Sequence, residues 1–196
     1  MVRVALCLVF IACTAAVPAC GGSNDGGRFD GNGYSLEIAG GWEDTTEDAP
    51  TFEELGFDDP ALAEIGVDAT ITGEESDDFA PNLAIVTTAA PRTATARKLA
   101  EANLRTTREQ STLPSGAGGG TIDTSASEVD DAELGGEPAA SYEQVAEAPP
   151  GDVRQLQLYA VHDGTAYAVT FSGLDSGQYE EDLPAVEAML DSWTWI

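Results

Sequence analysis

Apolar and polar residues alternate along the last third of the chain in a way that predicts a hairpin. Residues 153–161 and 166–171 form two runs of strand length, rich in β-branched and aromatic side chains. Asp163-Gly164 lies between them and is typical of a two-residue hairpin turn. In the return run the alternate residues from Tyr167 to Phe171 share one face, which is expected to point toward the core.

Beyond this hairpin the apolar spacing changes to that of a helix. One stripe of an amphipathic helix is indicated by apolar residues at steps of four, three and four: Tyr179, Leu183, Val186 and Leu190. A proline is compatible with a helix in its first turn, so Pro184 places the predicted start near Asp182. Residues 193–196 are expected to form a short aromatic strand.

The earlier part of the chain predicts five further strands and a second helix. The strands are expected over residues 33–39, 68–73, 83–89, 122–129 and 137–146. The run 83–89 is apolar on both faces, which favours a central place in the sheet. Thr93 or Thr95 would cap a helix that ends near Gln110. Its buried side would carry Ala96, Leu99, Ala100 and Asn103.

The segments between these elements have the composition of loops. Residues 43–66 are acidic, with a short helix expected over 60–65, and Trp42 is expected to return to the core. Residues 116–120 are rich in glycine, lack the lysine of a phosphate-binding loop, and are interpreted as a linker. Because only one predicted helix joins two strands, parallel βαβ winding is disfavoured. The pattern therefore predicts one α+β domain with a largely antiparallel sheet and two main helices.

The first 19 residues have the features of an export leader. Arg3 provides a basic start, and the apolar run over 4–16 is shorter than the roughly 20 residues that a membrane-spanning helix needs. Val17-Pro18-Ala19-Cys20 resembles a bacterial lipobox, in which the cysteine is acylated and becomes the first residue of the mature chain. The alternative is an ordinary signal peptide in which Cys20 has no role. Residues 21–27 favour the lipobox, because their Gly, Ser, Asn and Asp would form a flexible tether.

Cleavage at this site would set the domain organisation and the use of cysteine. Residues 20–32 are interpreted as the lipidated cysteine with its tether, and residues 33–196 as a single domain. Cys7 and Cys13 lie in the leader, so the mature chain would keep no thiol for a disulfide, a metal site or a nucleophile. We therefore expect a protein on the outer face of the cell membrane, held there by lipid on Cys20, with a fold that rests on its hydrophobic core.

The charge of the chain is strongly negative. Its formal net charge is −27 and would become −28 when Arg3 is removed with the leader; Lys98 is the only lysine. Nucleic acid and anionic lipid head groups would be repelled by such a surface, so a nucleic-acid partner is not expected. Solubility near an anionic envelope, adaptation to salt, and recruitment of cations or of a basic partner all fit this composition.

Few residues suggest chemistry. A dense run of carboxylates is a weak candidate for a cation site, although such runs are usually solvated: Glu74, Glu75, Asp77 and Asp78.

His162 is the only histidine, and its place directly before a hairpin turn predicts an exposed, non-catalytic side chain. Residues 30–33 (Asp-Gly-Asn-Gly) fail the calcium-loop pattern and predict a turn. The neighbouring carboxylates Asp130 and Asp131 would point apart on a strand, which does not suit paired acid catalysis.

Three stretches, in their order and spacing, carry a resemblance to a known family. They are Gly33-Tyr34-Ser35-Leu36-Glu37-Ile38 with Gly41-Trp42, Gly136-Glu137-Pro138-Ala139 leading to Tyr142, and Tyr159 through residues 166–171 to Leu190-Asp191-Ser192-Trp193. Together they resemble the PsbP/Mog1-like superfamily, and within it actinobacterial lipoproteins of the LpqN and DcrB-like kind. The resemblance implies an α-β-α sandwich around an antiparallel sheet. An acidic insertion near residues 43–76 departs from that pattern.

The resemblance also implies a class of function. Such domains serve mainly as binding or assembly modules, so we expect no enzyme activity, no catalytic residue and no cofactor. The leading hypothesis is a membrane-anchored module for a protein partner of the cell envelope. The alternative is a carrier of a small apolar or lipid ligand, in a pocket between sheet and helix lined by residues such as Tyr167, Phe171 and Leu183.

Overall fold

The computed structural model describes residues 26–49, 66–110, 124–147 and 151–196. Cys20 and the features predicted over residues 60–65 and 116–120 lie outside these ranges. Within the described parts of the chain, no helix combines the length and the apolar character needed to cross a membrane.

Eight antiparallel strands of the described residues form the main sheet. The predicted hairpin is present as β9 (Val153–His162) and β10 (Thr165–Leu174), and the predicted central strand β5 (Asn82–Ala89) pairs with β10. The order across the sheet is β3 (Glu43–Asp44), β4 (Gly66–Thr72), β5, β10, β9, β8 (Glu137–Ala146) and β6 (Thr124–Ala126), with β7 (Asp130–Leu134) also paired to β8. A short 3-10 helix, η1 (Thr46–Asp48), follows β3.

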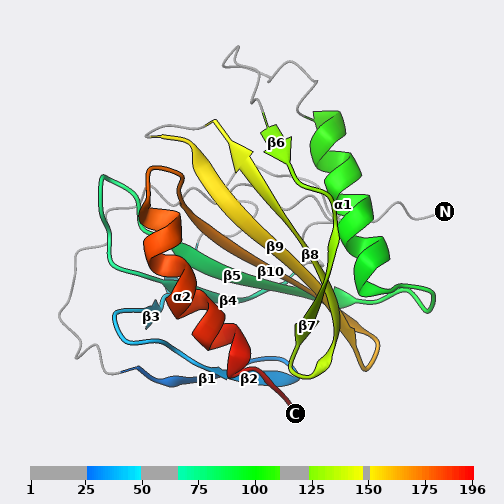
Figure 1. Ribbon diagram of the computed structural model, residues 1–196. Helices are drawn as coiled ribbons and strands as arrows, with labels where there is room; N and C mark the ends of the chain where they lie inside the picture. The colour runs from blue at the N-terminus through cyan, green and yellow to red at the C-terminus, as the bar shows by residue number, and fades with distance from the viewer. Residues whose placement is uncertain (1–25, 50–65, 111–123, 148–150) are drawn as a thin grey trace.

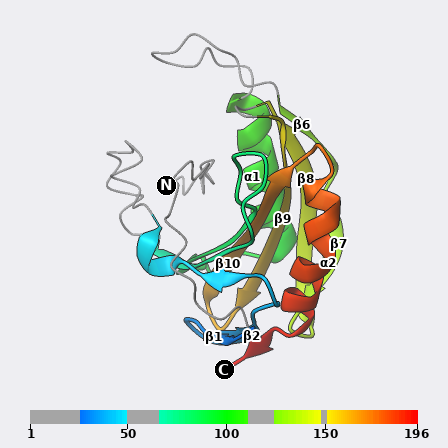
Figure 2. The same cartoon turned by 90° about the vertical axis from the view of Figure 1, so that its left-hand side faces the viewer.

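Helices cover both faces of this sheet, as Figures 1 and 2 show. The first helix, α1 (Ala96–Gln110), packs on one face. On the other face lie α2 (Gln178–Asp191) and a small antiparallel sheet. The strands of the small sheet are β1 (Arg28–Asp30), β2 (Tyr34–Glu37) and β11 (Thr194–Trp195). The expected fold class, an α+β sandwich with a largely antiparallel sheet and two main helices, is confirmed.

Large aromatic side chains fill the layer between the main sheet and α2. As predicted, Tyr167 and Phe171 point into this layer from β10 and are buried. The Phe171 ring stacks on Tyr179 of α2 with a centroid separation of 4.9 Å. Tyr34 of β2 stacks on Trp193 at 4.0 Å, with ring planes 6° apart. These contacts hold α2 and the small sheet against the same apolar face.

Small side chains let α1 approach the opposite face closely. Ala100 is fully buried, and together with Leu104 it packs over Ala140 and Tyr159 of the sheet. The predicted buried side of the helix is confirmed, including its polar member: Asn103 is buried and accepts a hydrogen bond of 2.7 Å from the Tyr142 hydroxyl. A buried amide in this layer is tolerated because its oxygen has a partner.

A row of buried carboxamides crosses the same face of the sheet. Gln144 donates to the Gln155 side-chain oxygen at 2.6 Å, and Gln155 donates to the Ser172 hydroxyl at 2.9 Å. The side-chain oxygen of Gln157 accepts from the Thr170 hydroxyl at 3.0 Å. Because these residues are cross-strand neighbours on β8, β9 and β10, the row is a consequence of strand register.

The expected start of the domain at residue 33 is wrong. Residues 28–30, assigned to the tether by composition, form β1 and pair with β2, with Arg28 opposite Glu37. The sequence Asp30-Gly-Asn-Gly33 is the turn between these strands, as predicted. Phe29 is the one apolar residue of the strand, which is too short to show an alternating pattern.

The predicted start of the second helix near Asp182 is also wrong. Helix α2 begins at Gln178, so Pro184 lies inside the helix. Proline has no N–H to donate to the carbonyl of Glu180, four residues earlier. Both residues are exposed, so water can hydrate that carbonyl. The helix gains the burial of Tyr179 by starting early.

The strand expected over residues 122–129 is present as β6, and a further strand, β7, follows it. Both pair with β8, so they form one edge of the sheet that is interrupted at Ser127–Val129. The sequence of β7, Asp-Asp-Ala-Glu-Leu, is acidic, which explains why it was not predicted as a strand. Charged side chains suit an edge strand because they oppose pairing with another chain.

Candidate functional site

The few cations of this acidic protein are concentrated around α1. Five of the eight lysine and arginine residues lie between residues 92 and 108, where Glu101 is the only acidic residue. The spacing of basic residues was visible in the sequence, yet only the total charge was interpreted there. In the structure, three arginines of this cluster line a groove on the surface of the protein.

A groove with a volume of about 600 Å³ runs between α1 and the segment that joins β6 to β7. Figure 1 shows these elements side by side at one edge of the molecule. The groove, called the α1 groove below, is lined by Arg97, Glu101, Leu104, Arg105, Arg108, Glu109, Glu128 and Val129. The three arginines, Glu101, Glu109 and Leu104 belong to α1, and Glu128 and Val129 form the opposite wall.

Two of the arginines fasten α1 to the neighbouring edge strand. Arg97 donates to the Asp131 carboxylate at 2.8 and 3.2 Å and to the Val129 carbonyl at 3.1 Å. Its hydrogen bond with Asp131 raises the pKa of Arg97 further above its ordinary value, so the group is always charged. Arg108 donates to the Ser127 carbonyl at 3.3 Å and to the Glu128 carboxylate at 3.2 Å. The two walls of the groove are held together by these contacts.

The third arginine of the α1 groove is not engaged by any residue that the structure describes. Arg105 is exposed, lines the groove, and has no hydrogen bond or ion pair within the described residues. A guanidinium group binds a carboxylate through two parallel hydrogen bonds, so Arg105 is suited to an Asp or Glu of a partner. The glutamates Glu101, Glu109 and Glu128 on the same walls would repel a polyanion.

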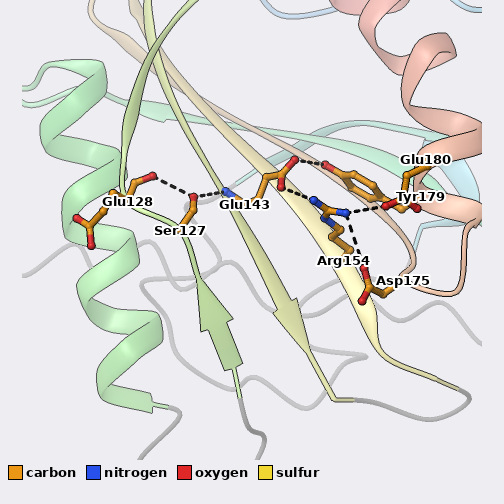
Figure 3. Close-up of polar contacts among 7 residues, drawn as sticks. All are labelled: Ser127, Glu128, Glu143, Arg154, Asp175, Tyr179 and Glu180. Carbon is orange, nitrogen blue, oxygen red and sulfur yellow. Dashed lines mark hydrogen bonds and ion pairs between the residues drawn. The ribbon is translucent and has the colours of Figure 1, made fainter.

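A second polar cluster, drawn in Figure 3, surrounds Arg154. Its guanidinium lies 2.7 Å from the carboxylates of Glu143 and Glu180, and 4.7 Å above the Tyr179 ring. Tyr179 donates to the other oxygen of Glu143 at 3.1 Å. Asp175 lies 3.9 Å from Arg154. One guanidinium is shared among three carboxylates, and these contacts hold the start of α2 against β8 and β9.

The acidic run that the sequence offered as a cation site lies in a tight turn. Ser76 and Phe79 form an isolated bridge, and the two residues between them, Asp77 and Asp78, have φ angles of 52° and 61°. Glu74 and Glu75 precede this turn and are exposed like the two aspartates. No three His, Cys, Asp or Glu side chains converge in a metal-binding arrangement anywhere in the described ranges. The described structure therefore does not support a cation site at these four carboxylates.

The expected exposure of His162 is wrong. Its side chain is 18% exposed, because the ring stacks on Trp195 and Nδ1 lies 2.9 Å from the Glu137 carboxylate. Asp163 is 3.7 Å from Nε2. Neither partner is a hydroxyl that a general base would activate. His162 therefore joins β11 to the hairpin ends of the sheet, a contact between distant residues that local pattern does not predict.

The site proposed for a carried ligand is filled by protein. Tyr167 and Phe171 are 2% and 1% exposed, and both are engaged in ring contacts. Leu183 packs against the same cluster. Trp42 and Trp193 are buried there as well, as core packing predicts. The layer between sheet and α2 thus offers these residues no open pocket.

Comparison with known proteins defines the fold class. No protein-family model and no curated protein matches the chain. Among solved structures, it is similar to the cyanobacterial PsbP of Synechocystis with a TM-score of 0.58 and 13% identity, covering 93% of this chain and all of the other. LpqN of Mycobacterium tuberculosis, a protein involved in cell envelope biogenesis, gives a TM-score of 0.53 at 13% identity, covering 87% of this chain and 84% of LpqN.

A third similar structure comes from a eukaryote. The Ran-binding protein Mog1p of Saccharomyces cerevisiae gives a TM-score of 0.51 at 7% identity, over 88% of this chain and 96% of the yeast protein. At such identities the likeness concerns the fold. The chain therefore has the PsbP/Mog1-like fold, an α+β sandwich whose solved examples include the three proteins described here.

Proposed function

We propose that this protein is a lipid-anchored, extracytoplasmic binding module that engages a protein partner of the cell envelope through the α1 groove. The observation that carries the proposal is Arg105, an exposed guanidinium without a described partner in a groove whose other two arginines are already bound. The chain as a whole is strongly acidic, and three of its eight basic residues line this groove, so an acidic partner meets less repulsion here than the overall charge would impose.

The proposed partner presents an aspartate or glutamate to Arg105. That carboxylate would form paired hydrogen bonds with the guanidinium, while the remaining side chains of the partner avoid Glu101 and Glu128 on the walls. Nucleic acid and densely anionic surfaces do not fit, because three glutamates line the groove. A protein surface of mixed charge is the chemistry that suits this lining.

The proposed lack of enzymatic activity is supported by the geometry of the polar clusters. His162 is stacked on Trp195 and hydrogen-bonded to Glu137, and the carboxylates around Arg154 are engaged with Arg154 or with Tyr179. The roles of structurally similar proteins also favour binding or assembly, since Mog1p is a Ran-binding protein and LpqN is involved in envelope biogenesis. Anchoring through Cys20 is proposed on the leader and lipobox of the sequence.

Site-specific photo-crosslinking in the native host tests the proposal. A photoreactive residue at Glu101 in the α1 groove should give a discrete adduct with one membrane-fraction protein, while one at Glu187 on α2 should not. Arg105→Glu should weaken the purified complex by at least about tenfold, since it replaces attraction by repulsion. The matched control is Arg92→Glu, an exposed arginine outside the groove.

Two results would contradict this function. Equal adducts from Glu101 and Glu187 would show that the groove is not the docking surface. An unchanged complex after Arg105→Glu would show that the guanidinium does not bind the partner. Cys20→Ala tests the location separately, because the variant should leave the membrane fraction.

A further inference from the structure

The length of the tether restricts which end of the domain can face a membrane. Cys20 and Gly26, the first described residue, are six peptide units apart. A fully extended chain gains at most 3.3–3.6 Å per residue, so these six units span no more than about 20 Å. A domain held by lipid on Cys20 would therefore keep Gly26 within roughly that distance of the lipid head groups.

Gly26 enters the fold at one end of the small sheet. The Gly27 carbonyl accepts a hydrogen bond from the Ile38 amide, directly after β2. A side chain at Gly26 would collide with the Ile38 carbonyl, so the chain lies close against the end of that strand. The small sheet is thus the part of the domain nearest to the anchor. Figures 1 and 2 show β1 and β2 at the end of the molecule opposite to β6.

The other end of the small sheet carries exposed apolar surface. Ile196 is 72% exposed and is the one large hydrophobic side chain exposed to that degree in the described residues. Its amide bonds to the Gly33 carbonyl, at the opposite end of β2 from Gly26. The preceding residue, Trp195, is half-buried and turned inward, with its indole stacked on His162 and bonded to the Leu134 carbonyl. Ile196 therefore supplies the exposed apolar group at this end of the sheet, and an aliphatic side chain gains free energy when it leaves water for the head-group region.

We propose that the small sheet lies against the phospholipid surface, with lipid on Cys20 at one end and Ile196 in the head-group region at the other. The proposal rests on the lipid anchoring proposed above. The charged residues Arg28, Asp30 and Glu37 on these strands sum to −1, which a zwitterionic surface tolerates better than an anionic one. Two points of contact would orient the domain, and β6 with the C-terminal end of α1 would face away from the bilayer.

Spin labels on the full-length, lipidated protein test this orientation. Once the leader is removed, Cys20 is the only cysteine and is blocked by lipid, so one introduced cysteine takes a unique nitroxide label. Thr194→Cys and Ile196→Cys place labels on the small sheet, and Ser125→Cys on exposed β6 is the matched control. The protein is reconstituted in phosphatidylcholine vesicles, and label accessibility to oxygen and to a water-soluble nickel chelate is measured.

The expected result is that both small-sheet labels collide several-fold more with oxygen, relative to the nickel chelate, than the Ser125→Cys label does. Circular dichroism checks that each labelled protein is folded, and Thr194→Cys keeps the test valid should Ile196→Cys be unstable. Equal accessibility at all three positions, in protein that floats with the vesicles, would overturn the orientation alone. Protein that fails to float would overturn the anchoring on which the orientation rests.

Discussion

Trp195 lies flat against His162, with ring centroids 4.4 Å apart and ring planes that differ by 10°. The Trp195 indole also donates to the Leu134 carbonyl at 3.3 Å, and His162 contacts Glu137. Residues from β11 are thereby fixed to the ends of two hairpins of the main sheet. The position of the small sheet depends on these contacts, and with it the end of the domain that we place near the membrane.

Gly135→Ala should weaken this contact. Gly135 has a φ angle of 58°, and a side chain there would meet the Trp195 indole nitrogen at 2.6 Å. The left-handed conformation costs about 1–2 kcal/mol for alanine, and displacement of the indole adds to it, so a loss of about 2–3 kcal/mol in unfolding free energy is expected. Urea unfolding followed by tryptophan fluorescence measures it.

The neighbouring glycine gives the control for that variant. Gly136 also has positive φ, at 79°, but a side chain there would meet open space. Gly136→Ala should therefore lose about 1–2 kcal/mol, the conformational cost alone, and keep native fluorescence. Equal losses of unfolding free energy for the two variants would show that a side chain at Gly135 does not displace the Trp195 indole at any measurable cost.

Arg154→Ala should destabilise the start of α2. The substitution leaves Glu143 and Glu180 without the cation that lies 2.7 Å from each, and uncovers the Tyr179 ring. The Arg154 side chain is partly buried, so we expect a loss of about 1–3 kcal/mol in denaturant unfolding. Arg154→Lys should recover part of it, because lysine keeps the charge and loses the fork geometry.

The exposed pair Arg28–Asp30 provides the comparison for Arg154. Arg28 Nε lies 2.8 Å from Asp30 Oδ1, but both side chains are more than 60% exposed. Solvent screens such a pair, so Arg28→Ala should cost less than about 1 kcal/mol. A similar loss for the two alanine variants would mean that the Arg154 cluster contributes no more than an ordinary surface pair.

Sequence patterns predicted those elements that local spacing determines. Strands β5, β8, β9 and β10 are long, with apolar or alternating residues that match their burial, and the Asp163-Gly164 turn fixes the register of the central hairpin. Helix α1 was predicted for the same reason, since its small buried residues recur at helical spacing. These elements contain most of the core.

The parts that were missed depend on contacts between residues distant in sequence. Strand β1 has three residues and is stable because β2 pairs with it, and α2 starts early because Tyr179 is buried on Phe171. The α1 groove needs the edge strand near Val129 to lie beside α1, and no local pattern specifies that arrangement. Arg105 could be noted as a basic residue from sequence, but its lack of a partner among the described residues depends on the fold.

All five tyrosines should resist ionisation while the protein is folded. Burial raises the pKa of each above the ordinary value of about 10, and at Tyr34 and Tyr179 nearby carboxylates add to the effect. Because the folded pKa exceeds the unfolded one, this contribution to stability is complete below about pH 10 and is lost as pH rises toward the folded pKa. The protein should therefore lose stability and unfold at alkaline pH.

Absorbance at 295 nm with parallel circular dichroism measures that titration. Less tyrosinate should form at pH 10 in the folded protein than in the unfolded chain, and most of it should form in a cooperative step together with loss of structure. In concentrated urea the same five groups should titrate smoothly around pH 10, as in an unfolded chain. Gradual ionisation near pH 10 in protein with a native dichroism spectrum would refute the assignment.

The buried carboxamide row predicts that two chemically identical substitutions will have different costs. Gln155 accepts from Gln144 and Gln157 and donates to Ser172, so Gln155→Leu leaves two buried amide donors without their acceptor. A loss of about 2–4 kcal/mol is expected. Gln144 makes one of these bonds, and its own side-chain oxygen is buried without a partner among the residues that the structure describes.

Gln144→Leu should therefore change the unfolding free energy by less than about 1 kcal/mol, because it removes an unsatisfied acceptor and leaves Gln155 bound to Gln157 and Ser172. Both residues are equally buried, which makes the pair a matched test of hydrogen bonding rather than of packing. Urea unfolding of the two variants measures the difference. Equal costs would mean that a water molecule hydrogen-bonds the Gln144 side-chain oxygen, so that every carboxamide of the row has its hydrogen-bond partners.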